Sequence, residues 1–154
     1  TQEEACDAAV TLYQEENTAL HLLPKALTLG VGCRKGTSQA ALENAYAALL
    51  AEQNFAPEAF VQATSIDLKA NEPGLLAFCT AHGWELKTYS AEELSELPGD
   101  FTPSPFVAQI TGVDNVCERA AVRASGGHLI RKKWKGAGVT FAVALAPVHF
   151  DWRW

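Results

Sequence analysis

The sequence has no methionine, no apolar run near the roughly 18 residues that a membrane-spanning helix needs, and no C-x-x-C pair. The first residues, Thr1 to Glu4, lack the basic and apolar regions of a signal peptide. These absences argue against a membrane or secreted protein and predict a cytoplasmic one. The lack of methionine, even at position 1, suggests a piece of a longer chain, although an initiator before Thr1 could also have been removed.

Potential metal ligands are few and scattered. Four histidines and four cysteines show none of the spacings that are typical of zinc sites, the cysteines being Cys6, Cys33, Cys79 and Cys117. We therefore expect buried, reduced thiols and no metal site. The net charge of −6 argues against a nucleic-acid partner.

The composition is that of a globular protein. The chain has 154 residues, of which 48% are hydrophobic and 19% charged, so a single domain with its own core is expected. Apolar periodicity and capping signals predict helices over residues 3–16, 38–53, 73–82, 90–97 and 115–125. An apolar run predicts a strand over residues 26–32, and loose apolar–polar alternation predicts another over residues 60–66. Further strands are predicted over residues 84–89, 128–133 and 139–145.

Alternating strands and helices, followed by two adjacent strands, indicate an α/β fold. Because residues 134–138 are too few for a crossover, the last two strands should form an antiparallel hairpin. The predicted architecture is one domain with a mixed sheet of about five strands flanked by helices. In such sheets, ligands bind beyond the carboxyl ends of the parallel strands.

The most distinctive stretch is Leu29-Gly30-Val31-Gly32-Cys33-Arg34-Lys35-Gly36-Thr37-Ser38. It joins a predicted buried strand to a helix that Thr37 or Ser38 can cap. Exposed backbone N–H groups at a helix start attract anions, and two adjacent cations strengthen that tendency. We expect Gly32 or Gly36 to have a positive φ or to be too crowded for a side chain.

Neither of two familiar phosphate-binding motifs fits this stretch. A dinucleotide fingerprint requires G-x-G-x-x-G, but Gly36 comes one residue late, and a P-loop requires Gly-Lys-Ser/Thr, whereas Lys35 precedes Gly36. A nucleotide-phosphate module is therefore disfavoured. A tight structural turn with solvated charges is the alternative to an anion site.

A second polar stretch, from Ser65 to Leu75, follows the next parallel strand. Its carboxylates Asp67 and Glu72 could act as a general base and acid, or could pair with a cation and cap a helix. Both polar stretches should lie at the same edge of the sheet, near Arg34, Lys35 and Lys69. A further run of cations, residues 131–135, is either a solvated strand face or a source of contacts for a polycarboxylate.

Four stretches resemble the C-terminal domain of the cobalamin-biosynthesis protein CbiG, which also occurs alone as CobE. They are residues 30–37, residues 65–75, Gly112-Val113 with residues 116–121, and Lys132 with residues 138–142. The resemblance covers roughly residues 26–146. It implies that 26–154 form the CobE/CbiG C-terminal-like domain, whereas 1–25 are an N-terminal helix or the end of a preceding region.

The resemblance implies corrin-ring biosynthesis and a cobalt-corrinoid intermediate as the small-molecule partner. CbiG opens the ring-A lactone of cobalt-precorrin-5A and releases acetaldehyde, so this chain is either such a hydrolase or its substrate-binding domain. The alternative is a non-catalytic CobE-like carrier or scaffold. Other cobalamin enzymes, or an N-terminal domain of the hydrolase, are the implied protein partners, and no further cofactor is expected.

The predicted site combines these residues. Asp67 and Glu72 are the catalytic candidates. The predicted substrate contacts are Gly32, Cys33, Arg34, Lys35, Gly36, Thr37, Ser65, Lys69, Glu118 and Lys132.

Overall fold

The computed structural model describes residues 9–10, 21–22, 26–99, 101 and 115–147. A five-stranded sheet forms its centre, with strand order β5-β4-β3-β7-β6. The strands are β3 (Leu27–Gly32), β4 (Phe60–Ile66), β5 (Glu85–Tyr89), β6 (His128–Gly136) and β7 (Val139–Leu145). Strands β3, β4 and β5 are parallel, whereas β7 is antiparallel to both β3 and β6. The predicted mixed sheet and C-terminal hairpin are confirmed.

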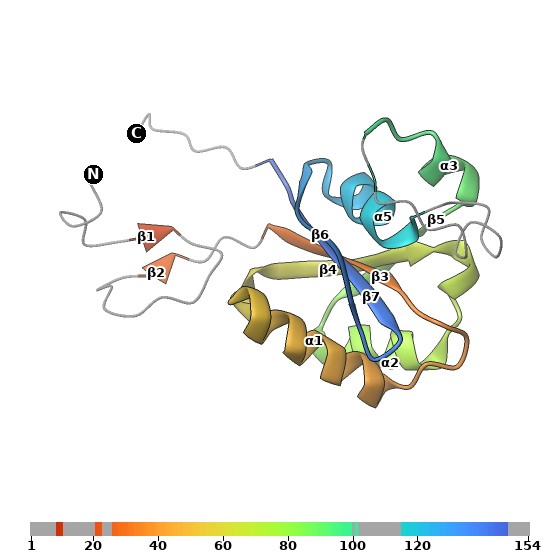
Figure 1. Ribbon diagram of the computed structural model, residues 1–154, viewed down its shortest axis with the longest axis horizontal. Helices are drawn as coiled ribbons and strands as arrows, with labels where there is room; N and C mark the ends of the chain where they lie inside the picture. Colours follow the sequence, from red (N-terminus) through yellow and green to blue (C-terminus); the bar gives the residue numbers. More distant parts are fainter. Residues whose placement is uncertain (1–8, 11–20, 23–25, 100, 102–114, 148–154) are drawn as a thin grey trace.

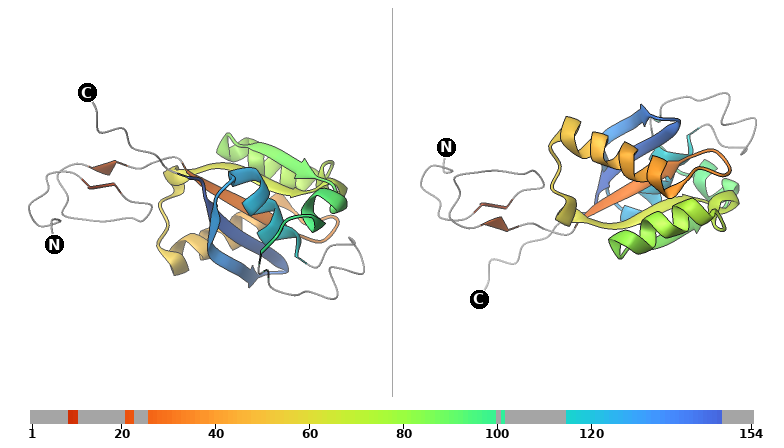
Figure 2. Two further views of the ribbon diagram at one scale, coloured as in Figure 1. Left: turned by 90° about the horizontal axis from the view of Figure 1, so that it is seen from above. Right: turned by 90° about the horizontal axis from the view of Figure 1, so that it is seen from below.

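Helices cover both faces of the sheet (Figure 1). One face carries α1 (Gln39–Gln53) and α2 (Pro73–His82), and the other carries α5 (Val116–Ser125), with α3 (Ala91–Ser95) beside it. Figure 2 shows the same layers from above and below. Two short 3-10 turns, η2 (Pro57–Ala59) and η3 (Asp67–Lys69), lie at the two ends of β4. Within the described ranges, no helix combines the length and apolarity needed to cross a membrane.

Local capping chemistry sets the helix boundaries. The Ser38 hydroxyl accepts a hydrogen bond from the Ala41 N–H at 3.1 Å and begins α1, which ends at Asn54 in the left-handed conformation with φ 57°. Ser90 and Glu93 form the predicted capping box of α3, although that helix ends at Ser95 rather than at residue 97.

The hairpin is tighter than predicted. β6 continues to Gly136, and only Ala137 and Gly138 turn the chain, with φ values of 53° and 78°. Two positive φ angles are typical of a type I′ turn, whose twist matches that of the flanking strands. The predicted strand end at residue 133 was wrong because this turn needs only two residues.

The predicted N-terminal helix is wrong at residues 9–10. Ala9–Val10 form a short strand, β1, which pairs in parallel with β2 (His21–Leu22). Helix propensities differ by only a few tenths of a kcal/mol between most residues, so strand pairing can override them. The rest of that predicted helix, and residues 150–154, lie outside the described residues.

The two faces of the sheet are packed differently. Toward α1 and α2 the core is large and apolar, and there Phe78 is fully buried, whereas Leu76 is 40% exposed. Toward α5 the packed side chains are small. Even a Cβ on Gly30 would overlap the carbonyl oxygen of Cys117. This close approach brings the N-terminus of α5 to the edge of the sheet where the parallel strands end.

Candidate functional site

The two polar stretches meet where β3 and β4 end. The carboxylate of Glu72 accepts a hydrogen bond from the backbone N–H of Gly36 at 2.8 Å, joining residues 36 positions apart. Glu72 is only 9% exposed and precedes α2 without capping it through its side chain. Glu72 therefore holds the glycine turn against the start of α2.

Two glycines make this contact possible. Gly36 has a φ of 80°, a conformation that side-chain-bearing residues rarely adopt. A Cβ on Gly74 would overlap the carbonyl oxygen of Thr37, so the first turn of α2 lies directly against the glycine turn. The expected strand, turn and helix start over residues 26–38 are confirmed.

A thiol, a hydroxyl and an ammonium group lie within this junction. The Thr37 hydroxyl donates to the carbonyl oxygen of Arg34 at 2.7 Å. Burial raises the pKa of the Cys33 thiol, whereas the nearby positive charge of Lys69 lowers it and the negative charge of Glu72 raises it. Residues of the second polar stretch therefore influence the pKa of a thiol in the first.

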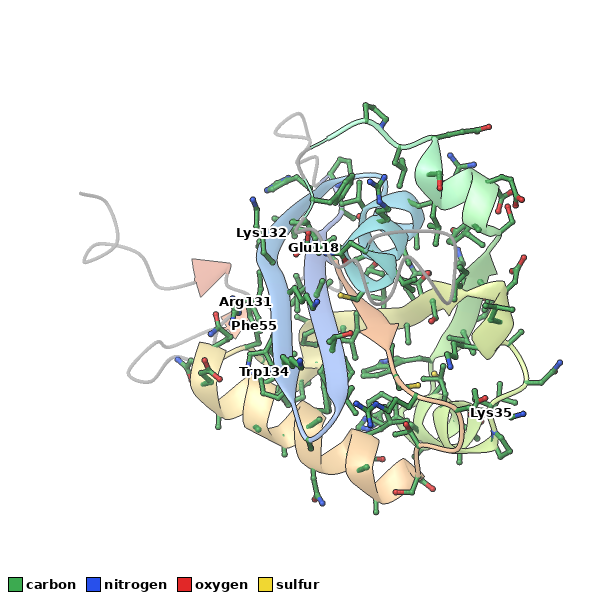
Figure 3. All side chains as sticks on the ribbon, turned by 45° about the vertical axis from the view of Figure 1, so that its right-hand side comes forward. Lys35, Phe55, Glu118, Arg131, Lys132 and Trp134 are labelled. Carbon is green, nitrogen blue, oxygen red and sulfur yellow. The ribbon has the colours of Figure 1, made fainter. Side chains whose placement is uncertain are left out.

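The charged side chains of the junction are largely accessible. Arg34, Lys35 and Asp67 are exposed, and Lys69 is half-buried. Figure 3 shows Lys35 at the turn between β3 and α1, beside the start of α2. Cations and a carboxylate at the surface give this edge the means to bind an anion and to accept a proton.

Two further predicted contacts lie at this edge, of which Ser65 is buried and Gly32 is half-buried. The Ser65 hydroxyl is fully buried and donates to the carbonyl oxygen of Val31 at 2.8 Å. Gly32 is crowded, since a Cβ there would overlap the hydroxyl of Thr140, which bonds to the Gly32 carbonyl at 3.2 Å. In this structure both residues maintain the shape of the edge.

Glu118 and Lys132 form a separate group beside α5. The carboxylate of Glu118 is fully buried and accepts from the backbone N–H of Lys133 at 2.6 Å, where the β6–β7 register shifts. Figure 3 shows Glu118 next to Lys132, and both well away from Lys35. Lys132 is exposed. The structure therefore does not bring these two residues to the glycine turn.

The described cysteines Cys33, Cys79 and Cys117 are free thiols. Burial raises the pKa of Cys117 to about 12, and that of Cys79 to about 11. Among the residues described, no group of three or more histidine, cysteine, aspartate or glutamate side chains could hold a metal ion.

Two residues that shape this edge, Gly74 and Thr140, are not among the predicted site residues. Gly74 belongs to the second polar stretch, and its position one residue after Pro73 was the available signal. Thr140 stands in an apolar strand, and nothing in its surroundings in the sequence pointed to Gly32. Register pairing of β3 with β7 brings the two residues opposite each other.

These features define a class of protein, a small α/β domain with a mixed sheet. Its parallel strands end at a cationic glycine turn, which is held in place by a buried carboxylate. Residues 27–144 match the family described as "Cobalamin synthesis G C-terminus". The chain belongs to this family, and therefore to cobalamin biosynthesis. The predicted family is confirmed.

Curated relatives are longer proteins. The chain is 38% identical over 133 residues to "Cobalt-precorrin-5A hydrolase" of Priestia megaterium, covering 86% of this chain and 35% of that protein. It is 34% identical over 125 residues to the protein of the same name from Salmonella typhimurium, covering 81% and 36%. The chain thus spans about a third of the length of these relatives.

Solved structures share the fold. CobE, "a protein from the cobalamin (vitamin B12) biosynthetic pathway", is 27% identical with a TM-score of 0.73, covering 83% of this chain and 95% of that one. A putative cobalamin biosynthesis protein G homolog from Sulfolobus solfataricus has a TM-score of 0.64 at 20% identity, covering 93% and 45%. The second likeness shows the fold alone.

Proposed function

We propose that this domain binds a carboxylate-rich tetrapyrrole precursor of cobalamin, as part of a hydrolase that opens the lactone of cobalt-precorrin-5A and releases acetaldehyde. The observation that carries the proposal is the Glu72–Gly36 hydrogen bond, which holds a cationic turn at the carboxyl edge of the parallel strands. Membership of the family and the names of the curated relatives supply the substrate class.

The cations of the edge suit such a ligand. A corrinoid precursor carries several peripheral carboxylates, and charge-assisted hydrogen bonds to carboxylates are stronger than neutral ones. Arg34 can hold a carboxylate with two parallel N–H groups, while Lys35 and Lys69 act as point charges. Lys132, beside α5, would meet a different carboxylate of a large ligand. Because Ser65 and Glu118 are buried and already bonded, we give them a supporting role.

Lactone opening requires that a water molecule lose a proton as it adds to the carbonyl carbon, and that the leaving oxygen gain one. Asp67, exposed directly after β4, is our candidate for the base. Glu72 is our candidate for the acid, with one oxygen occupied by the Gly36 N–H. The changes Asp67→Asn and Glu72→Gln should each lower acetaldehyde release while leaving binding largely intact.

The binding test compares wild type, Arg34→Ala and Lys133→Ala at two salt concentrations, titrated with a polycarboxylate corrinoid and followed by its visible spectrum. Arg34→Ala should weaken binding roughly ten- to hundredfold, the equivalent of about 1.5–3 kcal/mol. Lys133→Ala, the matched charge deletion away from the turn, should have little effect. Wild-type binding should also weaken with salt, since exposed charges are screened over about 8–10 Å. Equal affinities for all three proteins would contradict the proposal.

A non-catalytic carrier is the second candidate, favoured by one observation. The likeness to CobE covers 95% of that chain, so a domain of this size stands alone there. A carrier would bind the corrinoid but release no acetaldehyde, whether or not the remaining part of a hydrolase is supplied. Restored acetaldehyde release on adding that part would favour the hydrolase domain instead.

A further inference from the structure

Leu68 is the most exposed large apolar side chain among the described residues. It is 61% exposed, compared with 40% for Leu76 and 37% for Val61. A single exposed leucine is common on protein surfaces, so its location is the more informative observation. Leu68 lies in η3, between the exposed Asp67 and the half-buried Lys69, at the carboxyl end of β4.

The backbone that carries Leu68 is well fixed. The N–H of Ala70 donates to the carbonyl of Asp67 at 3.0 Å, and the N–H of Glu72 donates to the carbonyl of Lys69 at 3.2 Å. The Glu72 carboxylate then ties this turn to Gly36. Because this backbone is already fixed, covering Leu68 with a ligand costs only the rotamer freedom of its side chain.

Leu68 also lies beside the cations of the candidate site. Its neighbour Lys69 is close enough to Cys33 to lower the pKa of that thiol, and Arg34 and Lys35 follow Cys33 directly. An apolar contact and positive charges therefore occur at one edge of the sheet. A ligand that fits both must combine an apolar body with anionic groups at its periphery.

We infer that Leu68 packs against the apolar face of the tetrapyrrole macrocycle while the neighbouring cations hold its carboxylates. This inference rests on the proposed function and assigns to Leu68 a part in ligand recognition. The macrocycle offers a broad, methyl-bearing surface, and covering an exposed leucine with it removes apolar area of both partners from water.

The test compares Leu68→Ser with Val61→Ser, a similar change at an exposed apolar residue near the amino end of β4, using a cobalt corrinoid polycarboxylate as the probe. Leu68→Ser should weaken binding about tenfold without changing its dependence on salt, because apolar contact is not screened by ions. Val61→Ser, at the opposite end of β4, should bind like wild type. Lys69→Ala should weaken binding and also reduce the salt dependence.

Two further measurements separate recognition from folding. Leu68→Met keeps the apolar area and should retain wild-type affinity. Because Leu68 is exposed, the thermal midpoint of Leu68→Ser should stay near that of wild type. If Leu68→Ser binds as tightly as wild type, the inference fails while the proposed function stands. If wild type itself does not bind the corrinoid, both fail.

Discussion

Substitutions of Glu72 give the sharpest test of how the glycine turn is held. Glu72 is 9% exposed, its carboxylate bonds to the Gly36 N–H, and its side chain does not cap α2. Replacing Glu72 by alanine therefore removes one long-range hydrogen bond and no helix cap. Such charge-assisted bonds contribute about 1.5–3 kcal/mol to stability.

Three variants of Glu72 separate the effects of the hydrogen-bond acceptor, the negative charge and the length of the side chain. Glu72→Gln keeps a neutral acceptor in place and should cost about 1 kcal/mol of unfolding free energy, because neutral hydrogen bonds still contribute about 0.5–1.5 kcal/mol. Glu72→Ala should cost about 2–3 kcal/mol. Glu72→Asp keeps the charge but is one methylene shorter, so it should resemble alanine more than glutamine.

Urea unfolding measures these differences as shifts of the midpoint at an unchanged slope. Glu85→Ala, at an exposed position of the edge strand β5, is the control and should stay within about 0.5 kcal/mol of wild type. A Glu72→Ala protein as stable as this control would refute the view that the carboxylate holds the turn. A glutamine variant as unstable as the alanine variant would show that charge, rather than the bond, matters.

Other consequences concern the glycines and the thiols. Gly74→Ala should destabilise the fold more than Gly36→Ala, as urea unfolding would show, because a Cβ at Gly74 overlaps the Thr37 carbonyl whereas one at Gly36 meets no atom and suffers only from its positive φ. Equal losses would contradict this. The raised pKa values of Cys79 and Cys117 mean that the unfolded chain loses these protons first. Stability should therefore fall as the pH rises above about 9 and be unaffected by these thiols at lower pH, which denaturation at several pH values would check.

The fold could be predicted from the sequence where local chemistry decides the structure. A capping serine at Ser38 and a residue tolerant of positive φ at Asn54 mark both ends of α1. Mostly apolar stretches indicated β3 and β7, which are largely buried on both faces, and loose apolar–polar alternation indicated β4. Such signals act over a few residues, so one sequence contains them in full.

Interactions between distant segments could not be predicted in the same way. Asn115 and Glu118 have the spacing of a capping box, and Asn115 accepts from the Glu118 N–H, but the Glu118 carboxylate also accepts from the backbone N–H of Lys133 in β6. The N–H of Lys133 lies where the strand register shifts and needs another acceptor. Only the packing of α5 against the β6–β7 hairpin shows that this N–H needs an acceptor from α5.

The residues predicted for the candidate site show the same division. Of the predicted contacts, Arg34, Lys35 and Lys132 are exposed, whereas Ser65 and Glu118 are fully buried and bonded to backbone groups. A family motif contains both kinds of residue, since a ligand needs exposed groups and those groups need a fixed backbone. Because a ligand contacts only what it can reach, the buried members should affect affinity through stability, and the exposed members should affect it directly.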